Sequence, residues 1–452
     1  MLKEAVAYYH ELLADFDLSE SSRIALDEGL ERTKLIFGGR RLSPYLRPHF
    51  VTAADWARVT KICETVWSAL QKVKDAAVES EELLDELGIT EIEKELVAVD
   101  PKYKQVSPNA RLDSFLTDSS YSYVELNGES PAGVAYADSA TEIFMQLPVM
   151  RKFAERYDVR GFAGRPLMLE VLLGCYEEFL GRAPEKKPVI AIVDLKDLPT
   201  QKEFELFKEY FQSQGYDSLI CSPEDLEFDG EKLSYAGVDI DIVYKRLLVN
   251  EYLPIMDEFP ALLNAYKAGA ICMVNSFRSK LVHKKAIFAV LTNEKYAHLF
   301  DEAELEAIRA HVPWTRKFRE EKTFNRDEEI DLIEWTRANA HKLVLKPNDD
   351  YGGHGIYIGW NSSANDWEEA IKIALADGDY LVQERVETSR ELFPYLESDG
   401  KIHMFEQLVD LDPLLFNGIV GSAFTRLSTT ELANVSSGGG MVPTFIISEK
   451  KK

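Results

Sequence analysis

The sequence predicts a soluble α/β protein of two or three domains, and three observations carry that prediction. Residues 189–220 give a strand, a helix and a second strand in turn, which is typical of a parallel sheet. Residues 342–358 contain two apolar strands that flank a lysine, a proline and three clustered glycines. The chain has 452 residues, enough to bury several cores.

Charge and composition exclude several classes of function. A formal net charge of −25 would repel a phosphate backbone, so we expect no nucleic-acid partner. No run of eighteen apolar residues occurs, and residues 1–5 lack a basic, apolar leader. We therefore expect no membrane insertion and a cytoplasmic location. The four cysteines form no CxxC pair, which predicts buried, reduced thiols.

The first hundred residues are predicted to be helical. Residues 52–55 fit a capping box, and apolar side chains then recur at three- and four-residue spacing as far as Leu70. The acidic, leucine-rich run at residues 79–95 is interpreted as a solvated helix face rather than a metal site. No chemistry is indicated in this region.

Residues 109–131 are predicted to form a hairpin, because two alternating stretches enclose turn-forming residues. Side chains two positions apart share a face, so Arg111 lies beside Asp113, and Glu125 beside Asn127. If the two faces coincide, two carboxylates, an amide oxygen and a guanidinium converge. Oxygen ligands of this kind suit Mg²⁺. The alternative is a salt-bridged surface hairpin.

Two helices and an α/β unit follow the hairpin. The helices are expected at residues 141–155, with a kink at Pro148, and at residues 165–180. The strand–helix–strand unit comes next, and a further strand is expected at residues 239–244. Because the unit lacks GxGxxG, we interpret it as scaffold and substrate wall rather than as a dinucleotide site.

Basic residues gather at residues 278–285, before an apolar helix expected at residues 286–291. The helix dipole would add to their positive field, which favours an anion site. The alternative is a set of lysines on an exposed helix start. His283 is interpreted as a packed or exposed histidine, because no second histidine lies at metal-ligand spacing.

The glycine loop after Lys346 can cradle a phosphate. Glycines let backbone N–H groups approach an anion closely, and the lysine supplies a fixed positive charge. No Gly-Lys-Ser/Thr follows, so the loop is not the helix-opening P-loop. The alternative is a glycine-rich hairpin with a solvent-exposed lysine.

Further elements are predicted around this loop. Asn325 is expected to cap a helix that leads into the Lys346 strand, with Glu328 at its third position. A helix at residues 367–376 and a strand at residues 380–386 follow, and this strand is placed to contact the edge of an adenine. Arg426 ends a later apolar strand, which makes it a candidate phosphate clamp or, alternatively, a structural arginine.

Together these pieces resemble the circularly permuted ATP-grasp proteins related to the synthetase part of glutathionylspermidine synthase. The resemblance covers roughly residues 105–445 and rests on the order of six motifs, namely Arg111-x-Asp113, Glu125-x-Asn127, Ser279-Lys280-Leu281 with Lys285-Ala286, Lys346-Pro347 with Gly352-Gly353-x-Gly355, Val382-Gln383-Glu384 and Arg426. In that family the metal-binding strands precede the nucleotide-clamping lysines, the reverse of the ordinary ATP-grasp order. This chain has the permuted order.

By position, the resemblance implies a metal site and a site for the transferred phosphoryl group. Asp113, Glu125 and Asn127 would be the ligands of two Mg²⁺ ions. Arg111 would lie near the γ-phosphate of ATP. Arg426 would hold the transferred phosphoryl group or the acyl phosphate.

The resemblance also implies a nucleotide site. Lys285 and Lys346 would bind the nucleotide phosphates, and Lys285 is preferred to Lys284 because alanine follows it. Gln383 and Glu384 would belong to the adenine hinge. A lid over the phosphates would contain Tyr351, Gly352, Gly353 and Gly355.

The implied architecture is a circularly permuted ATP-grasp core with a helical N-terminal region and a Rossmann-like, pre-ATP-grasp-type parallel-sheet domain. Five divisions are expected: the helical region, the metal-binding strands and helices, the Rossmann-like domain, the lysine and glycine-loop subdomain, and the C-terminal part of the core. Their bounds are residues 1–100, 101–185, 186–275, 276–395 and 396–452.

The implied reaction is an ADP-forming ligation that joins a carboxylate to an amine through an acyl phosphate. ATP and Mg²⁺ are the expected cofactors, and the substrates are a small carboxylate and a small amine, with a peptide among the candidates. Two other classes stay open: a Mg-ATP-binding regulatory or accessory protein, and a non-nucleotide acidic scaffold. No amidase-like Cys/His pattern precedes residue 105, and the sequence identifies neither the substrates nor the oligomeric state.

Overall fold

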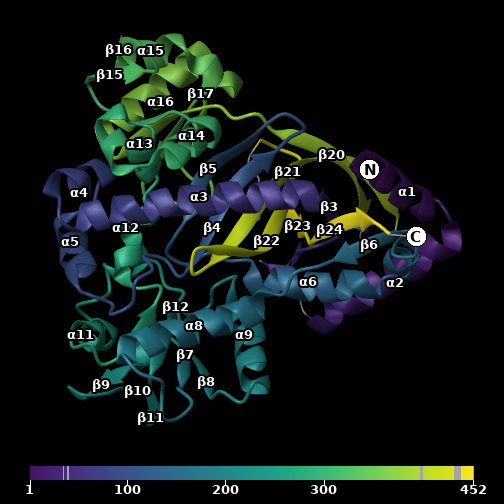
Figure 1. Ribbon diagram of the computed structural model, residues 1–452, viewed down its shortest axis with the longest axis horizontal. Helices are drawn as coiled ribbons and strands as arrows, with labels where there is room; N and C mark the ends of the chain where they lie inside the picture. Colours follow the sequence, from purple (N-terminus) through teal and green to yellow (C-terminus); the bar gives the residue numbers. More distant parts are fainter. Residues whose placement is uncertain (34, 38–39, 398–400, 432–438, 451–452) are drawn as a thin grey trace.

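The computed structural model describes residues 1–33, 35–37, 40–397, 401–431 and 439–450. Its architecture is mixed α/β, which confirms the α/β part of the predicted fold class. A six-stranded antiparallel sheet lies at the centre. A lobe with a four-stranded antiparallel sheet lies above it in Figure 1, and a four-stranded parallel sheet lies below it.

The central sheet joins two segments that are far apart in the chain. Its strands run in the order β23-β22-β21-β4-β5, and β20 also pairs with β21. They are β4 (Asn109–Leu116), β5 (Tyr121–Asn127), β20 (Ser389–Leu396), β21 (Ile402–Phe416), β22 (Ile419–Ser428) and β23 (Gly440–Val442). Because β21 is 15 residues long, it pairs with β20 along its first half and with β4 at its end. Polar side chains from both segments can therefore meet on one surface.

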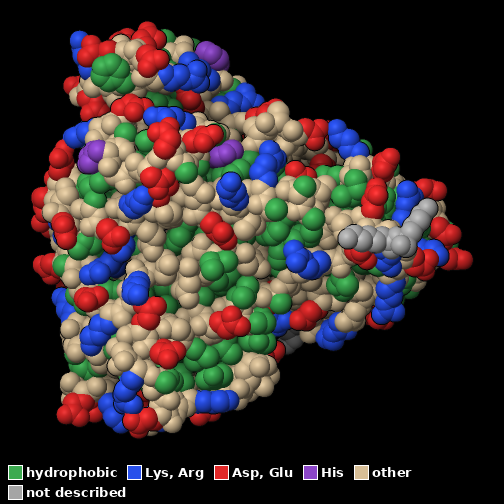
Figure 2. Space-filling model, viewed as in Figure 1, with side chains coloured by type: hydrophobic (Ala, Val, Ile, Leu, Met, Phe, Trp, Pro, Cys, Tyr) green, Lys and Arg blue, Asp and Glu red, His purple; other side chains and the backbone are tan. Residues whose placement is uncertain are grey.

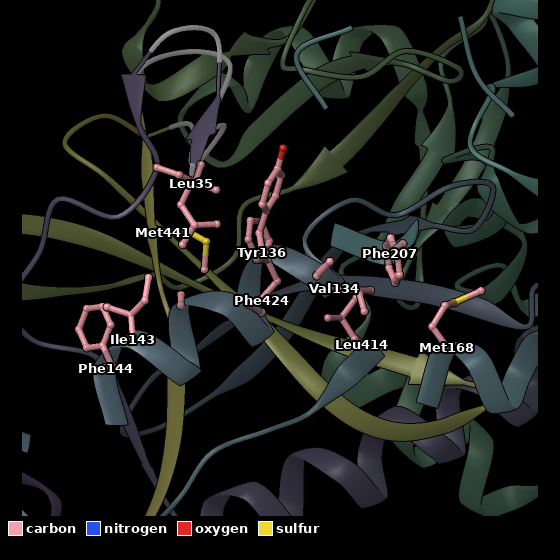
Figure 3. Close-up of a cluster of buried hydrophobic side chains, with 14 of the residues drawn as sticks. Leu35, Val134, Tyr136, Ile143, Phe144, Met168, Phe207, Leu414, Phe424 and Met441 are labelled. Atoms are coloured by element: carbon pink, nitrogen blue, oxygen red, sulfur yellow. The ribbon is translucent and has the colours of Figure 1, made fainter. Parts of the chain in front are cut away.

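Helices cover both faces of the central sheet. The apolar stripe of α3 (Ala53–Val78) packs with Leu411 on one face. Residues of α6 (Val134–Gln146) and α8 (Gly164–Leu180) pack with Leu414 on the other, and Figure 3 shows part of this second cluster. Each large apolar side chain buried in this way contributes roughly 1.5–3 kcal/mol, so the two layers hold the sheet as a firm platform.

The N-terminal region is helical, as predicted, with short strands in addition. Its helices are α1 (Leu2–Leu13), α2 (Phe16–Thr33), α3, α4 (Glu81–Leu87) and α5 (Glu91–Ala98). The Thr52 side chain accepts a hydrogen bond from the Asp55 backbone N–H, which confirms the predicted helix start. Most acids of residues 79–95 are exposed, as expected for a solvated helix face. Two helices form there instead of one, and Glu93 is an exception because it is buried against Lys284.

Short strands complete the N-terminal region and join it to the end of the chain. They are β1 (Ile36–Phe37), β2 (Arg40–Arg41) and the three strands of a separate sheet, β3 (His49–Thr52), β24 (Thr444–Glu449) and β6 (Tyr157–Arg160).

The predicted strand–helix–strand unit lies in a wholly parallel sheet with the order β13-β12-β7-β8. Its strands are β7 (Ile190–Val193), β8 (Ser218–Cys221), β12 (Ile242–Lys245) and β13 (Cys272–Val274), and α9 (Gln201–Ser213) connects the first two. The single strand expected at residues 239–244 is wrong. It is divided at Asp241, whose carboxylate accepts a hydrogen bond from the Val189 backbone N–H at 2.9 Å.

The residues before Asp241 belong to a small antiparallel sheet instead. Its strands are β9 (Glu227–Phe228), β10 (Leu233–Tyr235) and β11 (Val238–Ile240).

The upper lobe carries the predicted strand, glycine loop and strand. Its sheet has the order β14-β19-β17-β18, with strands β14 (Thr315–Lys317), β17 (Leu343–Pro347), β18 (Tyr357–Ile358) and β19 (Tyr380–Glu384). α16 (Ala364–Asp377) packs against β17, as expected for residues 367–376. The predicted cap at Asn325 is wrong, because this residue ends strand β15 (Lys322–Asn325). After β16 (Glu328–Asp331), Asp331 caps α15 (Leu332–Ala338).

The remaining helices are short, and several lie near the site. They are α7 (Pro148–Phe153), α10 (Val249–Tyr252), α11 (Ala261–Lys267), α12 (Lys280–His283), α13 (Ile287–Leu291) and α14 (Glu302–His311). The helix expected at residues 141–155 is divided into α6 and α7 just before Pro148, which lacks the N–H needed to continue a helix.

The cysteines are buried and the visible surface carries many acidic side chains, in line with the composition. All four cysteines are buried with free thiols, as predicted. Acidic side chains are spread over the face visible in Figure 2 rather than gathered in one patch. Within the described part of the chain, no helix is both long and apolar enough to cross a membrane.

Candidate active site

The predicted hairpin forms the floor of the candidate site. Strands β4 and β5 pair so that Arg111 faces Asn127 and Asp113 faces Glu125. Arg111 donates from Nε and Nη2 to the two carboxylate oxygens of Asp113, at 2.7 and 3.0 Å. The Asn127 amide nitrogen also donates to Asp113, at 3.0 Å. The predicted convergence of these side chains is therefore present, and Asp113 lies at its centre.

Strands β21 and β22 bring a second set of charged side chains to Asp113. Arg426 lies opposite Asp410 in the strand register. Its Nη2 lies 2.5 Å from both Asp113 and Asp410, and its Nε lies 2.9 Å from Asp412. We call Arg111, Asp113, Asp410, Asp412 and Arg426 the carboxylate–arginine cluster. All five side chains are buried, so this cluster ties the hairpin to the C-terminal strands.

The protonation of the cluster follows from its burial and its two arginines. Burial alone would raise the pKa of Asp113, but the Arg111 and Arg426 guanidinium groups hold that pKa well below its ordinary value. Burial raises the pKa of Asp410, and raises that of Asp412 by more, despite the opposing effect of Arg426. Two guanidinium groups oppose the three carboxylates, which makes the burial of the cluster tolerable.

A cavity of about 140 Å³ opens above this floor, between the central sheet and the sheet of the upper lobe. Ten of the residues singled out from the sequence line it, namely Asp113, Glu125, Lys285, Lys346, Tyr351, Gly352, Gly353, Gln383, Glu384 and Arg426. Arg111 and Asn127 lie behind the wall, in contact with Asp113. Gly355 lies outside the lining, where a Cβ would stand 2.7 Å from the Tyr380 hydroxyl oxygen.

Lys346 crosses from the upper lobe to the floor. Its ammonium donates to the backbone carbonyl of Val124 on β5 at 2.7 Å. Burial lowers the pKa of Lys346 to about 7, with Glu125 opposing that effect and Lys285 adding to it. This lysine therefore lies at the meeting point of two sheets, and an anion beside it would favour its charged form.

The adenine-hinge residues at the end of β19 are held by their neighbours. The Gln383 amide nitrogen donates to the Thr315 hydroxyl at 3.0 Å, which fixes it against β14. Glu384 accepts from the Asn325 amide at 3.3 Å. Both residues line the cavity, together with Val344 and Trp360.

The three lysines of the basic segment have different roles. The Lys280 ammonium lies 2.8 Å from the Glu129 carboxylate and 2.7 Å from that of Asp349. Lys284 is buried 3.0 Å from Glu93. Lys285 alone among the three lines the cavity, 3.6 Å from Glu125. The geometry therefore agrees with the preference for Lys285 over Lys284, and the charges of the other two lysines are already balanced.

The base of the glycine loop is docked onto α13. Asn348 accepts from the Ala286 N–H through its side chain at 2.8 Å and from the Lys285 N–H through its backbone at 3.0 Å. Lys285 in turn donates to the Asp350 carbonyl. Beyond this anchored base, Gly352 and Gly353 take left-handed φ angles of 71° and 80°, which other residues rarely adopt. The base of the loop is thus held by hydrogen bonds, and its tip has a backbone conformation that glycine permits.

Among the residues that the structure describes, two groups of side chains have ligand atoms close enough together for a metal ion. Asp113, Asp410 and Asp412 each offer a carboxylate oxygen within 4.8 Å of the others, and Glu125 lies opposite Asp113. An all-oxygen set of this kind fits Mg²⁺. Asn127, as placed, turns its nitrogen toward Asp113, so its role as a ligand stays a prediction.

The second group is Glu129, His283 and Asp349. The Lys280 ammonium bonds both carboxylates, and the Glu129 side chain is fully buried. The position of a cation is therefore already taken by a lysine. Burial lowers the pKa of His283 to about 4, so this imidazole is neutral at neutral pH, in keeping with the interpretation of His283 as a packed residue.

Sequence reasoning missed Asp410 and Asp412. Both point to one face of β21 at alternating positions, and this two-residue spacing of acids within an apolar strand was the available signal. This spacing alone does not indicate a buried site, because carboxylates in a strand most often face solvent. Trp360, which also lines the cavity, carried no signal beyond its apolar character.

One curated protein is similar to part of this chain. No family profile matches the chain. Over 218 residues, or 46% of its length, the chain is 24% identical to a Frankia alni protein named as a glutamate–cysteine ligase. The matched region spans 23% of that relative, so the chain covers only about a quarter of its length.

Solved structures agree with the fold. A glutathione synthetase-like effector from Globodera pallida aligns over 96% of this chain and 98% of its own, with a TM-score of 0.60 and 13% identity. A Methylobacillus flagellatus protein titled as a gamma-glutamylcysteine synthetase aligns over 86% of each chain, with a TM-score of only 0.42 and 11% identity. The first likeness establishes a shared fold, and the second is too low to carry an argument. None of these proteins is named for glutathionylspermidine synthase.

The carboxylate–arginine cluster yields a stability prediction. In an Arg426→Ala protein, three buried carboxylates would share only one guanidinium, and breaking a buried ion pair costs about 3–5 kcal/mol. We expect urea unfolding at pH 7 to show a loss of that size. Arg390→Ala is the control, because the Arg390–Glu431 pair is partly exposed and is worth at most about 1 kcal/mol. Equal, small losses in both variants would contradict this account of the cluster.

Proposed function

We propose that this chain is an ATP-dependent carboxylate–amine ligase that forms an amide bond and releases ADP and phosphate. One observation carries the proposal: two lysines, a glycine loop, a carboxylate pair and an arginine, drawn from four segments of the chain, line one cavity between two sheets. Two lysines and an arginine meet in one cavity of a chain whose net charge is −25, which favours an anionic ligand there. The name of the relative from Frankia alni, a glutamate–cysteine ligase, supports the same class of reaction.

In this proposal the triphosphate lies between Lys346, Lys285 and the glycine loop. The adenine ring would rest on β19 near Gln383 and Glu384, in contact with apolar lining residues such as Val344 and Trp360. Asp113 and Glu125 would hold Mg²⁺, which when bound neutralises phosphate oxygens and orients the γ-phosphate. The metal-free arrangement at Asp113 is closed by two guanidinium groups, so metal binding would require these to turn away.

The protein's own residues would then act by position and charge. A substrate carboxylate attacks the γ-phosphorus, the bond to the β-phosphate oxygen breaks, and ADP leaves. The amine next attacks the acyl carbon, inorganic phosphate leaves and the nitrogen loses a proton. Lys285 and Arg426 would stabilise the charge that develops on the transferred group, and the Tyr351 loop would exclude water.

We also propose a circularly permuted ATP-grasp core and candidate substrates. The metal-binding strands at residues 109–127 precede the lysine segment at residues 276–395, which supports the permuted order of an ATP-grasp core. The relative named as a glutamate–cysteine ligase supports small amino acids as first candidates for the substrates. The resemblance to glutathionylspermidine synthase supports a peptide carboxylate and a polyamine as the next pair.

A Mg-ATP-binding regulatory protein is the second candidate. It is favoured by the occupation of both Asp113 carboxylate oxygens by guanidinium groups, since a metal site blocked in this way could bind nucleotide without turnover. Tight nucleotide binding without ADP release for any substrate pair would support it.

Turnover gives the direct test of the ligase proposal. We expect ADP release from Mg-ATP to require both a carboxylate and an amine, in a screen that begins with L-glutamate and L-cysteine. Asp113→Asn should lower kcat by about a hundredfold or more, because an electrostatic group at the reacting centre is lost. Asp118→Asn, an exposed acid beyond the end of β4, serves as control. Near-normal turnover of Asp113→Asn would refute the assigned role.

The lowered pKa of Lys346 gives a pH prediction. In the free protein this lysine loses its proton above about pH 7, whereas bound triphosphate would keep it charged. ATP affinity is therefore full below pH 7 and should weaken by about tenfold for each pH unit above it. Lys346→Met should bind ATP more weakly and without this slope. Calorimetry between pH 6 and 9 measures both, and a slope that survives in Lys346→Met would contradict the prediction.

A further inference from the structure

A second cavity lies beside the segment that connects the upper lobe to the central sheet. Its volume is about 470 Å³, within the range of roughly 300–1,000 Å³ that is usual for small-molecule sites. The connecting segment, residues 384–387, leads from the end of β19 toward β20. Glu384, Arg385 and Val386 border both this cavity and the cavity proposed for the nucleotide. We call the larger one the connector cavity.

The central sheet and the upper lobe both contribute walls to the connector cavity. Ser122 comes from β5, and Arg309 comes from α14, which packs beside β5. Arg316 lies on β14 of the upper lobe, and Arg326 lies in the turn between β15 and β16. The two lysines and the glycine loop proposed for the nucleotide line only the other cavity. A ligand here would therefore contact both structural units without occupying the nucleotide cavity.

Four arginines line the connector cavity in a chain whose net charge is −25, and their acidic partners are few. Arg309 lies 3.9 Å from Glu302, at the edge of an ion-pair distance. Within the described part of the chain, Arg316, Arg326 and Arg385 form no ion pair, whereas most other arginines there have a carboxylate partner. The Arg385 guanidinium instead lies over an aromatic ring, 4.3 Å from its centroid.

Arg316 shows this imbalance most clearly, because it is only 3% exposed. Its guanidinium donates to uncharged oxygens, among them the Thr323 hydroxyl at 3.0 Å and the Thr292 and Phe324 carbonyls at 3.1 and 3.0 Å. Burial lowers the pKa of Arg316 to about 10. A buried charge without an opposite charge nearby is costly, and an anion in the cavity would offset that cost.

The acids of the lining do not restore the balance. Glu387 accepts hydrogen bonds from three hydroxyl groups of residues 117–120, and Glu384 accepts one from the Asn325 amide at 3.3 Å. Glu294 is exposed. Four guanidinium groups thus stand against three carboxylates, two of which are already held by uncharged donors. The connector cavity therefore offers an excess of positive charge.

We propose that the connector cavity is a binding site for a small anion with two or more acid groups, separate from the nucleotide. Arg309 and Arg326 receive acid groups from opposite structural units, and the charge of Arg316 lies behind them. Guanidinium groups suit carboxylates and phosphates alike, because their planar fork bonds two oxygens at once. Carboxylate and phosphate ligands therefore share the chemistry that this site recognises.

The position of the cavity gives the anion an effector role. A ligand that bonds Arg309 beside the central sheet and Arg326 in the upper lobe would hold these two units together next to the segment that connects them. Nothing in this step uses ATP, Mg²⁺ or the ligation reaction. The inference therefore goes beyond the proposed function and does not depend on it.

The test measures binding of two probe anions to the whole protein by calorimetry, at low salt and without Mg²⁺. The probes are citrate, which has three carboxylates, and pyrophosphate. Arg309→Gln and Arg326→Gln each remove one charge from an exposed side chain that lines the connector cavity alone. Lys346→Met removes a charge from the nucleotide cavity. Arg151→Gln is the matched control, an exposed arginine on α7 that lines neither cavity.

We expect at least one probe to bind the wild type at a single site with a dissociation constant of about 1 mM or tighter. Arg309→Gln and Arg326→Gln should each weaken this binding by about tenfold, the usual size for a hydrogen bond to a charged group. Lys346→Met and Arg151→Gln should stay within about twofold of the wild type. Tighter binding of citrate would identify a carboxylate ligand, and tighter binding of pyrophosphate a phosphate ligand.

Three results would overturn the inference. The first is that neither probe binds the wild type. The second is binding that Lys346→Met abolishes while Arg309→Gln and Arg326→Gln retain it, which would place the anion in the nucleotide cavity. The third is an equal loss in all four variants, which would indicate general attraction to positive charge rather than a site.

Discussion

The ion pairs of Arg426 with Asp113, Asp410 and Asp412 are the interaction on which the site depends. They join a hairpin from the first third of the chain to strands from its last tenth, inside a sheet whose two faces are both covered by helices. These side chains are buried, so the charges must satisfy one another. The same constraint keeps Asp113 ionised and directed toward the cavity.

Basic and acidic side chains both line the cavity, and the lysines around it differ in their partners. Lys280 and Lys284 are bound by buried carboxylates and fix the base of the glycine loop. Lys285 and Lys346 are left to face the cavity. The loop thus depends on one pair of lysines for its position, while another pair is available for a ligand. This division explains why neighbouring lysines in one short segment have different environments.

Local chemistry allowed much of the site to be predicted from the sequence. The two-residue spacing of Arg111 and Asp113 fixed their common face, and the alternation around Glu125 fixed the partner strand. The strand, glycine loop and strand at Lys346 followed from β-branched residues and glycine. The helix start at Thr52 followed from its capping pattern.

Contacts between distant segments could not be predicted in this way. The partnership of Asp113 with Asp410 and Asp412 depends on the antiparallel register of β21, which no local pattern specifies. Residues 239–244 look like one strand, but Asp241 binds the distant Val189 and divides them. The Asn325 cap failed because a hairpin, closed by pairing with β16, competed with the helix start.

A crystal structure of the protein with Mg²⁺ and a non-hydrolysable ATP analogue tests the central claim most directly. The account predicts adenine on β19 near Gln383 and Glu384, phosphates in contact with Lys285 and Lys346, and metal on Asp113 and Glu125. It also predicts that Arg426 turns from Asp113 toward the γ-phosphate. Nucleotide bound elsewhere, or an empty cavity at millimolar analogue with Arg426 still on Asp113, would contradict it.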